Sequence, residues 1–445
     1  MRIRPVALLA ALLGLGSGPA PLAAQAAPVA PVTEFTVNGL KVLVKQRPSA
    51  LTVSAGVFFA GDRANLTAAN AGIEKLLLDT ALEGSEHFPR EVLRTELARL
   101  AADLGSASNQ DYSVVSLQCT REAFDRAFEI LADVVMRPGL AEADLARVRG
   151  GMITERSSDD DDPDNQLIHL LEAEIYTGHS YALRVQGTGQ SLASLGQKEV
   201  RAYQLGLMQA ARMRLIVVGN VDPADIRRKV KAAFAGLPPG DSPEGGVPPL
   251  KFAAPSFQRT AREMRPTYVK GVCAAPAFDG ADMPAFRMLM NLLNNRVFLE
   301  LRRKANLSYA PGASVNLSAA PYGHVFFSTT KVDEAARLCL AEVARLKREP
   351  VPESDLKALR SSMRTTLYTS SQTNAAQAGQ LAQYELIGGS WRNSLVSSYD
   401  TVTPADIQRV AKTWLNNFQF FLLGPAGAEI DEAAFREVPE TVKVK

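Results

Sequence analysis

The sequence predicts an α+β fold made of two similar halves, each a sheet covered by helices, and three observations support this prediction. Strand-like apolar runs alternate along the chain with long amphipathic helical patterns, which is typical of that class. Residues 236–255 contain six prolines and four glycines without a hydrophobic period, so they are expected to form an exposed linker. Residues 142–152 resemble residues 353–363 at a constant offset of 211, which indicates a tandem duplication.

The individual elements follow from local patterns. Short runs of mainly apolar residues predict strands at 41–45, 52–59, 113–118 and 324–329. Each half then closes with the same succession, a capped amphipathic helix followed by an apolar strand. These pairs are residues 195–203 with 214–219, and residues 402–410 with 418–424. The repeated succession supports the duplication.

Residues 1–26 have the features of a secretory signal. Arg2 and Arg4 precede an apolar run at 6–15, and small residues follow as far as Ala26. The apolar run is too short to span a bilayer as a mature helix. We therefore expect export across the inner membrane, most simply to the periplasm of a Gram-negative cell. The mature chain is expected to form domains at 27–235 and 256–445, joined by the linker at 236–255.

The composition excludes two classes of partner. Outside residues 1–26 the chain has 47 basic and 47 acidic side chains, a balance that gives no electrostatic basis for binding nucleic acid or an anionic membrane. Cys119, Cys273 and Cys339 are odd in number and far apart, so they indicate neither a disulfide framework nor a metal site. We expect buried thiols, with a disulfide of an exported protein as the alternative.

One segment of the first half resembles a known family. Residues 72–85 (GIEKLLLDTALEGS) are similar to the helix on which insulinase and pitrilysin peptidases carry His-x-x-Glu-His. In that register Lys75 takes the place of the first zinc-binding His, Leu78 that of the catalytic Glu and Asp79 that of the second His. The resemblance implies two homologous, mainly antiparallel domains that close like a clam shell around an extended peptide.

The resemblance also implies that one zinc ligand is retained. The family takes its third ligand from a Glu further downstream, and Glu155 lies 76 residues after Asp79, before a similar acidic turn and proline. A protonated ammonium cannot coordinate, leucine cannot move a proton, and two carboxylates alone suit zinc poorly. We therefore expect no metal and no catalytic residue in this chain, and we expect the zinc on a partner subunit.

Lys75 is expected to supply the positive charge that the metal would have supplied. It would pair with Asp79, four residues further along the same helix, and with Glu155 across the sheet. The alternative is that Lys75 points into water.

Two further patterns are expected to be structural. The four histidines are isolated in the sequence and offer no substitute metal site: His87, His169, His179 and His324. Asp162 precedes Pro163 and is expected to cap a helix, because consecutive aspartates lack the spacing of a calcium loop.

The second half contains a segment similar to the family's Leu-Arg-x-x-x-Gly-Leu-Ala-Tyr. The resemblance implies that Arg302 and Tyr309 bind the peptide backbone beside the zinc and stabilise the reacting carbonyl. Asn306 stands where the family often has Gly, and asparagine tolerates the left-handed backbone conformation. The alternative is that Arg302 caps or salt-bridges its helix and that Tyr309 is a strand aromatic.

Small two-domain members of the family often work as dimers in which one subunit carries the zinc and the other presents the Arg and the Tyr. The resemblance therefore implies a non-catalytic subunit that pairs with a zinc-bearing homologue and acts on short or unfolded peptides. A scaffold or peptide-binding subunit of a larger complex is the competing interpretation. A third is an unorthodox enzyme built on Asp79 and Glu155.

Overall fold

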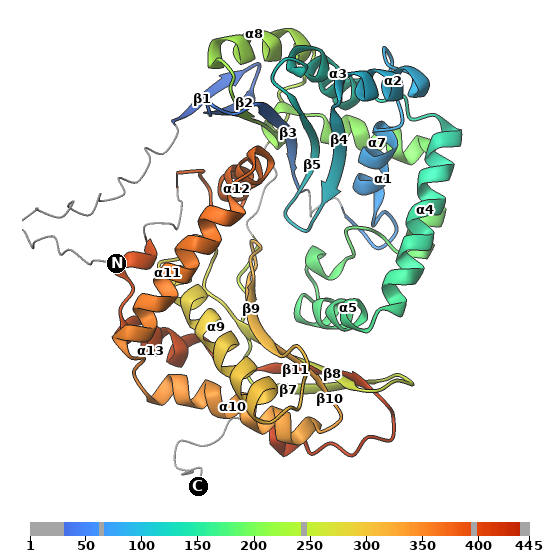
Figure 1. Ribbon diagram of the computed structural model, residues 1–445. Coiled ribbons are helices and arrows are strands. Elements are labelled where there is room, and N and C mark those ends of the chain that lie inside the picture. The colour runs from blue at the N-terminus through green and yellow to red at the C-terminus, as the bar shows by residue number, and fades with distance from the viewer. Residues whose placement is uncertain (1–30, 62–65, 242–246, 393–397, 437–445) are drawn as a thin grey trace, which may run out of the picture.

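The computed structural model describes residues 31–61, 66–241, 247–392 and 398–436, and these form two halves that stand opposite each other (Figure 1). The predicted secretory signal lies outside the described residues. Within them, none of the helices is both long and apolar enough to cross a membrane.

The first half contains a six-stranded sheet of order β1-β2-β6-β3-β5-β4. Neighbouring strands are antiparallel except for β2 and β6, which run parallel. The strands are β1 (Val32–Val37), β2 (Leu40–Gln46), β3 (Thr52–Ala60), β4 (Asp103–Ser108), β5 (Tyr112–Thr120) and β6 (Met213–Gly219). Every strand predicted in this half is present and extends slightly beyond the predicted range.

The second half contains a five-stranded sheet of order β7-β11-β8-β10-β9, in which only β7 and β11 are parallel. Its strands are β7 (Ser256–Ala261), β8 (Thr267–Ala274), β9 (Gly312–Asn316), β10 (Tyr322–Thr329) and β11 (Gln419–Gly424). This order repeats that of the first sheet from β2 onward. The predicted fold class, two similar α+β halves with mainly antiparallel sheets, is confirmed.

The helices carry the duplication at the predicted spacing. Helix α4 (Glu142–Asp161) and helix α11 (Glu353–Ser370) begin 211 residues apart, and α5 (Pro163–Ile175) and α12 (Asn374–Leu386) keep that offset at both ends. The other α-helices are α1 (Ile73–Ala81), α2 (Arg90–Leu100), α3 (Phe124–Met136), α6 (Gly189–Ser194), α7 (Gln197–Leu207), α8 (Pro223–Ala233), α9 (Met283–Val297), α10 (Val332–Arg348) and α13 (Pro404–Trp414).

Helix α5 begins where the sequence predicts. The Asp162 side chain accepts a hydrogen bond from the Asn165 backbone N–H at 3.0 Å, and Pro163 occupies the first helical position. This satisfies a backbone donor that the helix itself leaves unpaired. The expectation that Asp162 caps a helix is therefore confirmed.

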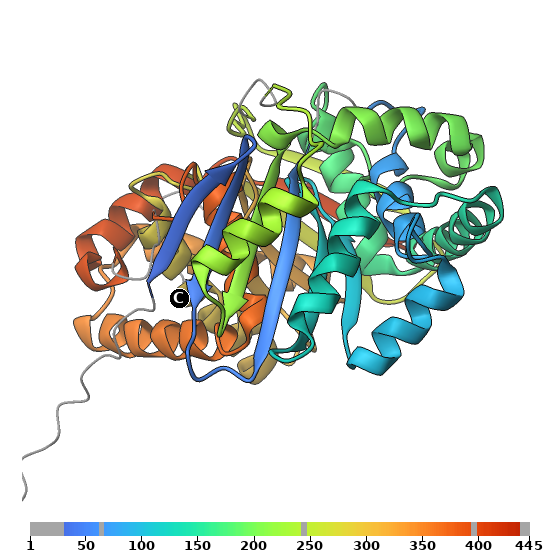
Figure 2. The same cartoon turned by 90° about the horizontal axis from the view of Figure 1, so that it is seen from above.

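Each half exchanges one helix with the other. One face of the first sheet is covered by helices of its own half, which lie over its strands in the view from above (Figure 2). The opposite face packs against α12 of the second half, whose Ala378, Leu381 and Ala382 contact Leu43 and Ile216 of the sheet. Helix α5 of the first half covers the second sheet in the same manner. The two halves therefore share buried apolar surface.

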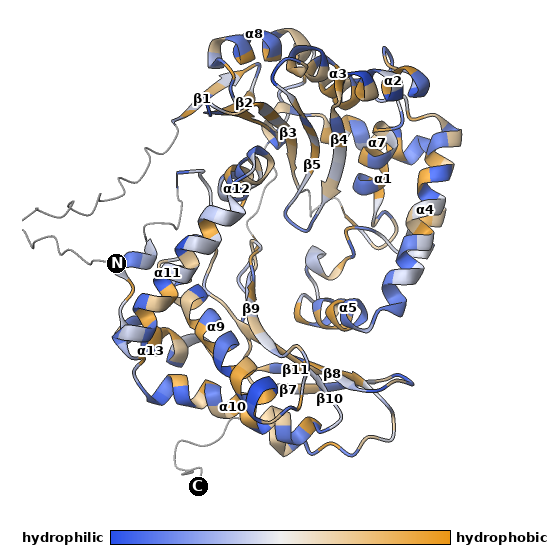
Figure 3. Ribbon diagram, in the orientation of Figure 1, coloured by the Kyte–Doolittle hydropathy of each residue, from blue (hydrophilic) through white to orange (hydrophobic). Residues whose placement is uncertain are grey.

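Apolar residues are concentrated in the strands and on the inward faces of the helices, whereas α4 carries many hydrophilic residues along its length (Figure 3). Cys119, Cys273 and Cys339 are all buried, as predicted. Burial raises the pKa of Cys119 to about 11 and that of Cys339 to about 12. In the linker, Val247, Leu250 and Phe252 are only partly exposed and pack beside α5 and the second sheet, because their side chains are apolar.

Candidate functional site

The degenerate zinc position lies on α1, which is largely buried in the first half. Gly72 precedes the helix with a φ of 93°, and a Cβ there would lie 2.9 Å from the Gly187 Cα atom, so only glycine fits. Leu78, at the position of the catalytic Glu, is 2% exposed and belongs to the hydrophobic core of the first half. The helix is thus fixed in place by apolar packing rather than by a metal.

Lys75 and Asp79 form an ion pair on α1. The Lys75 Nζ lies 2.7 Å from Asp79 Oδ2, and the Ser106 hydroxyl, on the edge strand β4, donates to Asp79 Oδ1 at 2.5 Å. The Lys75 side chain is 19% exposed, so the alternative that it points into water is wrong. Both carboxylate oxygens of Asp79 are engaged.

Glu155 does not join this pair, and that part of the prediction is wrong. Its side chain is 62% exposed, and its Oε1 lies 3.3 Å from Arg156 Nη2. Arg156 is itself buried and also bonds Asp159 at 2.5 Å. Because the adjacent residue supplies a cation, Glu155 is paired without turning toward α1. No hydrogen bond or ion pair links Lys75 to Glu155, both of which the structure describes.

The residues at this position do not fit zinc. An ammonium and a leucine replace two of the groups that the chemistry needs, and the Asp79 oxygens already accept from Lys75 and Ser106. Across the described ranges there is no group of three or more His, Cys, Asp or Glu side chains that could hold a metal ion.

Arg302 and Tyr309, the predicted substrate-binding pair, are brought into contact. Helix α9 continues into a π-helical segment, η3 (Phe298–Lys304), and Asn306 then adopts a φ of 50°, the left-handed conformation expected of it. The turn places the Arg302 Cζ atom 4.5 Å from the centroid of the Tyr309 ring. Arg302 also donates to Asn306 Oδ1 at 3.4 Å.

The pair is presented to the outside of the chain. Tyr309 is 78% exposed and precedes β9 rather than lying in a strand, so the strand-aromatic alternative is wrong. Arg302 forms no ion pair with any residue that the structure describes. Its guanidinium therefore has no carboxylate partner there, which leaves its donors available to a ligand.

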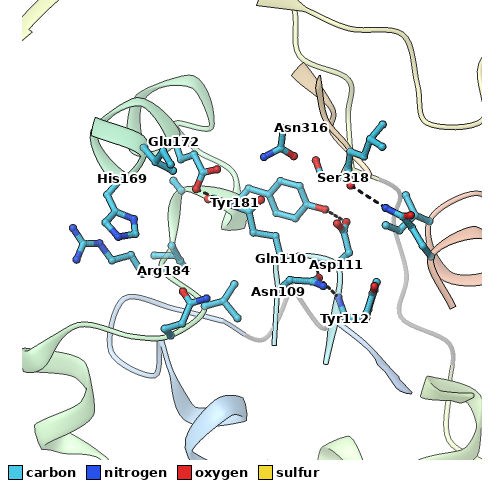
Figure 4. Close-up of a pocket in the computed structure, with 18 residues that line it drawn as sticks. Asn109, Gln110, Asp111, Tyr112, His169, Glu172, Tyr181, Arg184, Asn316 and Ser318 are labelled. Atoms are coloured by element: carbon cyan, nitrogen blue, oxygen red, sulfur yellow. Dashed lines mark hydrogen bonds between the residues drawn. The ribbon is translucent and has the colours of Figure 1, made fainter. Parts of the chain in front are cut away.

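A further polar site, which was not predicted from the sequence, lies between the two halves. It is a cavity of about 350 Å³ lined by the β4–β5 turn, α5, residues 181–186 and the segment after β9 (Figure 4). Tyr181 points toward Asp111 and donates a hydrogen bond to it, and the Ala319 backbone N–H donates to Asp111 Oδ1 at 3.0 Å. Asp111 thereby joins the first half to the second.

Glu172 makes the second connection between the halves. The Gln110 side chain donates to Glu172 Oε2 at 3.1 Å, and the Tyr322 hydroxyl donates to Glu172 Oε1 at 3.3 Å. Burial raises the pKa of Glu172 to about 7, and burial lowers the pKa of the nearby Lys270 ammonium. No local pattern could reveal these contacts, because the partners of Glu172 lie 62 and 150 residues away in the sequence.

Hydrogen bonds confirm a structural role for two of the histidines, His87 and His179, and His169 lies near a carboxylate. His87 Nδ1 lies 2.8 Å from Asp133, His169 Nε2 lies 3.6 Å from Asp159, and His179 Nδ1 accepts from the Tyr181 backbone N–H at 3.1 Å. The His324 Nδ1 is buried and, like the Nε2 of His169, has no hydrogen-bond partner among the described residues. Burial, assisted by the Lys270 charge, lowers the pKa of His324 to about 3.

Comparison with known proteins assigns both halves to one family. The chain matches the family models Insulinase (Peptidase family M16) over residues 41–189 and Peptidase M16 inactive domain over residues 194–363. It is 22% identical over 426 residues to cytochrome b-c1 complex subunit 1 of Homo sapiens, covering 93% of this chain and 85% of that protein.

Two further proteins extend the comparison. The beta subunit of the mitochondrial-processing peptidase of Blastocladiella emersonii is 24% identical over 254 residues, 56% of this chain and only 53% of that protein. The solved structure of a peptidase M16 inactive domain from Pseudomonas fluorescens has the same fold, with a TM-score of 0.81 at 18% identity, covering 90% of this chain and 100% of that one.

Proposed function

Since the chain belongs to the insulinase-type M16 peptidases, as a member without the zinc-binding histidines, we propose that it is a non-catalytic subunit that pairs with a zinc-bearing homologue. In this proposal Arg302 and Tyr309 complete the partner's peptide-binding site. The substrates are short or unfolded peptides, and the pair works in the periplasm.

The observation that carries the proposal is the exposed stack of Arg302 on Tyr309. The aromatic ring holds the guanidinium in one orientation, because the two planar groups attract each other at 4.5 Å. A fixed guanidinium and a phenol O–H are donors suited to an oxygen that gains negative charge during acyl transfer. Because Lys75, Leu78 and Asp79 leave no zinc site here, such a pair can act in peptide hydrolysis only beside the zinc of another chain.

The division of roles follows from these residues. The zinc of the partner would polarise the scissile carbonyl and activate water. From this chain, Arg302 would bind the peptide carbonyl and Tyr309 would donate its O–H to the developing oxyanion. The edge strand β4, which is unpaired on its outer side within the described sheet, would hold part of the peptide by main-chain hydrogen bonds.

A scaffold role is the competing proposal, favoured by similarity over 93% of this chain to a protein named as a subunit of the cytochrome b-c1 complex. A scaffold would use the fold for assembly alone. Arg302 and Tyr309 would then be replaceable without any loss of peptide cleavage.

Co-expression with a homologue from the same genome that has His-x-x-Glu-His separates the two proposals. We expect the chains to co-purify, the zinc to be on the homologue, and peptide hydrolysis to require both. Arg302→Ala should lower kcat/KM about a hundredfold, the usual cost of losing one oxyanion donor. Arg303→Ala is the matched control, because its guanidinium is 5.9 Å from the Phe298 ring and does not stack on Tyr309.

Two results would overturn the proposal of a non-catalytic peptidase subunit. One is full hydrolysis by the pair that carries Arg302→Ala, which would favour the scaffold. The other is stoichiometric zinc in this chain purified alone, which would require ligands other than those at the degenerate position.

A further inference from the structure

The second half contains a cavity at the place that corresponds to the degenerate zinc position of the first. Helix α9 packs against β9 and α11 as α1 packs against β4 and α4. The cavity has a volume of about 290 Å³ and is lined by α9, β9, α11, α12 and Tyr399. Thr366, which stands 211 residues after Glu155, is among its lining residues. The cavity therefore occupies, in the second half, the position that the degenerate zinc site occupies in the first.

Arg287 gives this cavity its charge. It projects from α9, and its Cζ atom lies 5.6 Å from the centroid of the Tyr399 ring. It makes no ion pair with the residues that the structure describes, and no Asp or Glu is among the residues that line the cavity. An arginine in a recess without a counter-ion attracts an anionic ligand.

Tyr399 adds a second unsatisfied group. The residue is only 4% exposed, and its hydroxyl oxygen is buried without a hydrogen-bond partner among the described residues. Burial raises the pKa of Tyr399 to about 12, with the Arg287 charge acting in the opposite direction, so the hydroxyl stays protonated at neutral pH. A buried donor without an acceptor is costly, and a bound ligand oxygen would relieve that cost.

One side of the cavity wall is apolar. Met290, Met363 and Leu367 line the cavity beside the polar groups. One guanidinium and one hydroxyl match a single carboxylate, whereas a doubly charged phosphate usually needs more cations. The adjoining strand β9 is the outermost strand of the second sheet, and its outer edge can accept an extended chain.

We propose that this cavity binds the C-terminal carboxylate of a peptide whose last residue is apolar, with Arg287 and Tyr399 holding the carboxylate. The thioether and leucine side chains would contact the last side chain. This inference needs neither zinc nor a partner subunit, so it stands apart from the proposed role of Arg302 and Tyr309.

Calorimetric titration of the full chain with N-acetyl-Ala-Leu as the free acid, and separately as its amide, tests the proposal. We expect the acid to bind and the amide to bind at least about tenfold more weakly, because a charge-assisted hydrogen bond is lost. Arg287→Gln should weaken binding of the acid by about the same factor. Tyr399→Phe, which removes only the hydroxyl, should weaken it several-fold, and Lys357→Gln, a loss of charge on the exposed face of α11, should leave it unchanged.

Three outcomes would show that the cavity is not a carboxylate site: no binding of the acid by the wild-type chain, equal binding of acid and amide, or wild-type affinity in Arg287→Gln. Hexanoate is the last ligand to be titrated, because it offers a carboxylate and an apolar tail without a peptide. Hexanoate that binds as tightly as the peptide acid would overturn the assignment to a peptide terminus. Circular dichroism of each variant separates loss of the site from loss of the fold.

Discussion

Leu78 fills the hydrophobic core at the position where the family has a catalytic base. Its side chain is buried among the apolar residues of the first half, next to Leu76 and Leu77. Lys75 and Asp79, which stand three residues before and one residue after Leu78 on the same helix, remain partly exposed and neutralise each other. Three substitutions thus convert a reactive face of α1 into a packed and charge-balanced one.

Asp79 should contribute measurably to the free energy of unfolding. Asp79→Asn keeps one oxygen that can accept from Ser106 but ends the ion pair with Lys75, which is only partly exposed. We expect a loss of about 1 kcal/mol, the usual value for such a contact, measured by urea unfolding. Asp125→Asn is the control, because the Asp125 side chain is 62% exposed and its removal should have little effect. Equal stability of Asp79→Asn and the wild type would contradict this account.

The sequence predicts the contacts of a residue when they are local. The Lys75–Asp79 pair follows from a spacing of four on one helix, and the left-handed Asn306 follows from its place in the turn. The orientation of Glu155 does not follow, because the buried Arg156 beside it takes up its charge. The low pKa of His324 could not be predicted from the local sequence either, because it depends on strands that only the folded sheet brings around the side chain.

Helix α5 shows what the exchange of elements between the halves contributes. Leu167 and Leu171 of α5 are buried against the second sheet, and the Tyr176 hydroxyl, just after the helix, donates to the Ala320 backbone oxygen at 2.6 Å. The spacing of Leu167 and Leu171 places both on one face of α5, but it does not determine which sheet covers that face. Its place on the second sheet is set by tertiary packing.

Leu171→Ala should therefore weaken the whole molecule. Leu171 is fully buried, so we expect a loss of about 3 kcal/mol in the free energy of unfolding, from lost burial and the cavity left behind. Leu205→Ala is the matched control, because Leu205 on α7 is 76% exposed. Thermal or urea unfolding in one cooperative transition would report the difference. A Leu171→Ala variant within error of the Leu205→Ala variant would show that α5 does not hold the halves together.

At the scale of the molecule, buried ionisable groups connect the halves. Glu172 comes from the first half, and Lys270, Tyr322 and His324 come from the second. The folded pKa of Glu172, about 7, exceeds its ordinary value of 4.5, so between these two pH values the folded state binds more protons than the unfolded state. The contribution of Glu172 to stability is therefore lost as pH rises through that window.

Glu172→Gln should reveal this dependence, because glutamine resembles the protonated acid at every pH. Relative to the wild type, we expect the variant to gain stability between pH 5 and pH 8, by about 3 kcal/mol at most. His324 acts in the opposite direction, since its pKa of about 3 lies below the ordinary 6.5 and its contribution is lost as pH falls through that range. Both proteins carry His324, so the difference between them isolates Glu172.

Urea unfolding at several pH values is the measurement, with Glu174→Gln, an exposed position on the same helix, as the control. A stability difference between Glu172→Gln and the wild type that does not change with pH would show that Glu172 ionises in the folded protein as it does in water.

The constant offset of 211 residues has a consequence for symmetry. In a dimer of identical chains, the two equivalent sites must carry the same residues, because one gene specifies both. Here the two copies are joined covalently and interlocked by α5 and α12, so each site can change alone. A substitution such as Leu78 affects one copy and leaves its counterpart free to acquire other residues, as Arg287 and Tyr399 illustrate. Fusion thus turns a symmetric pair into two independent sites within one chain.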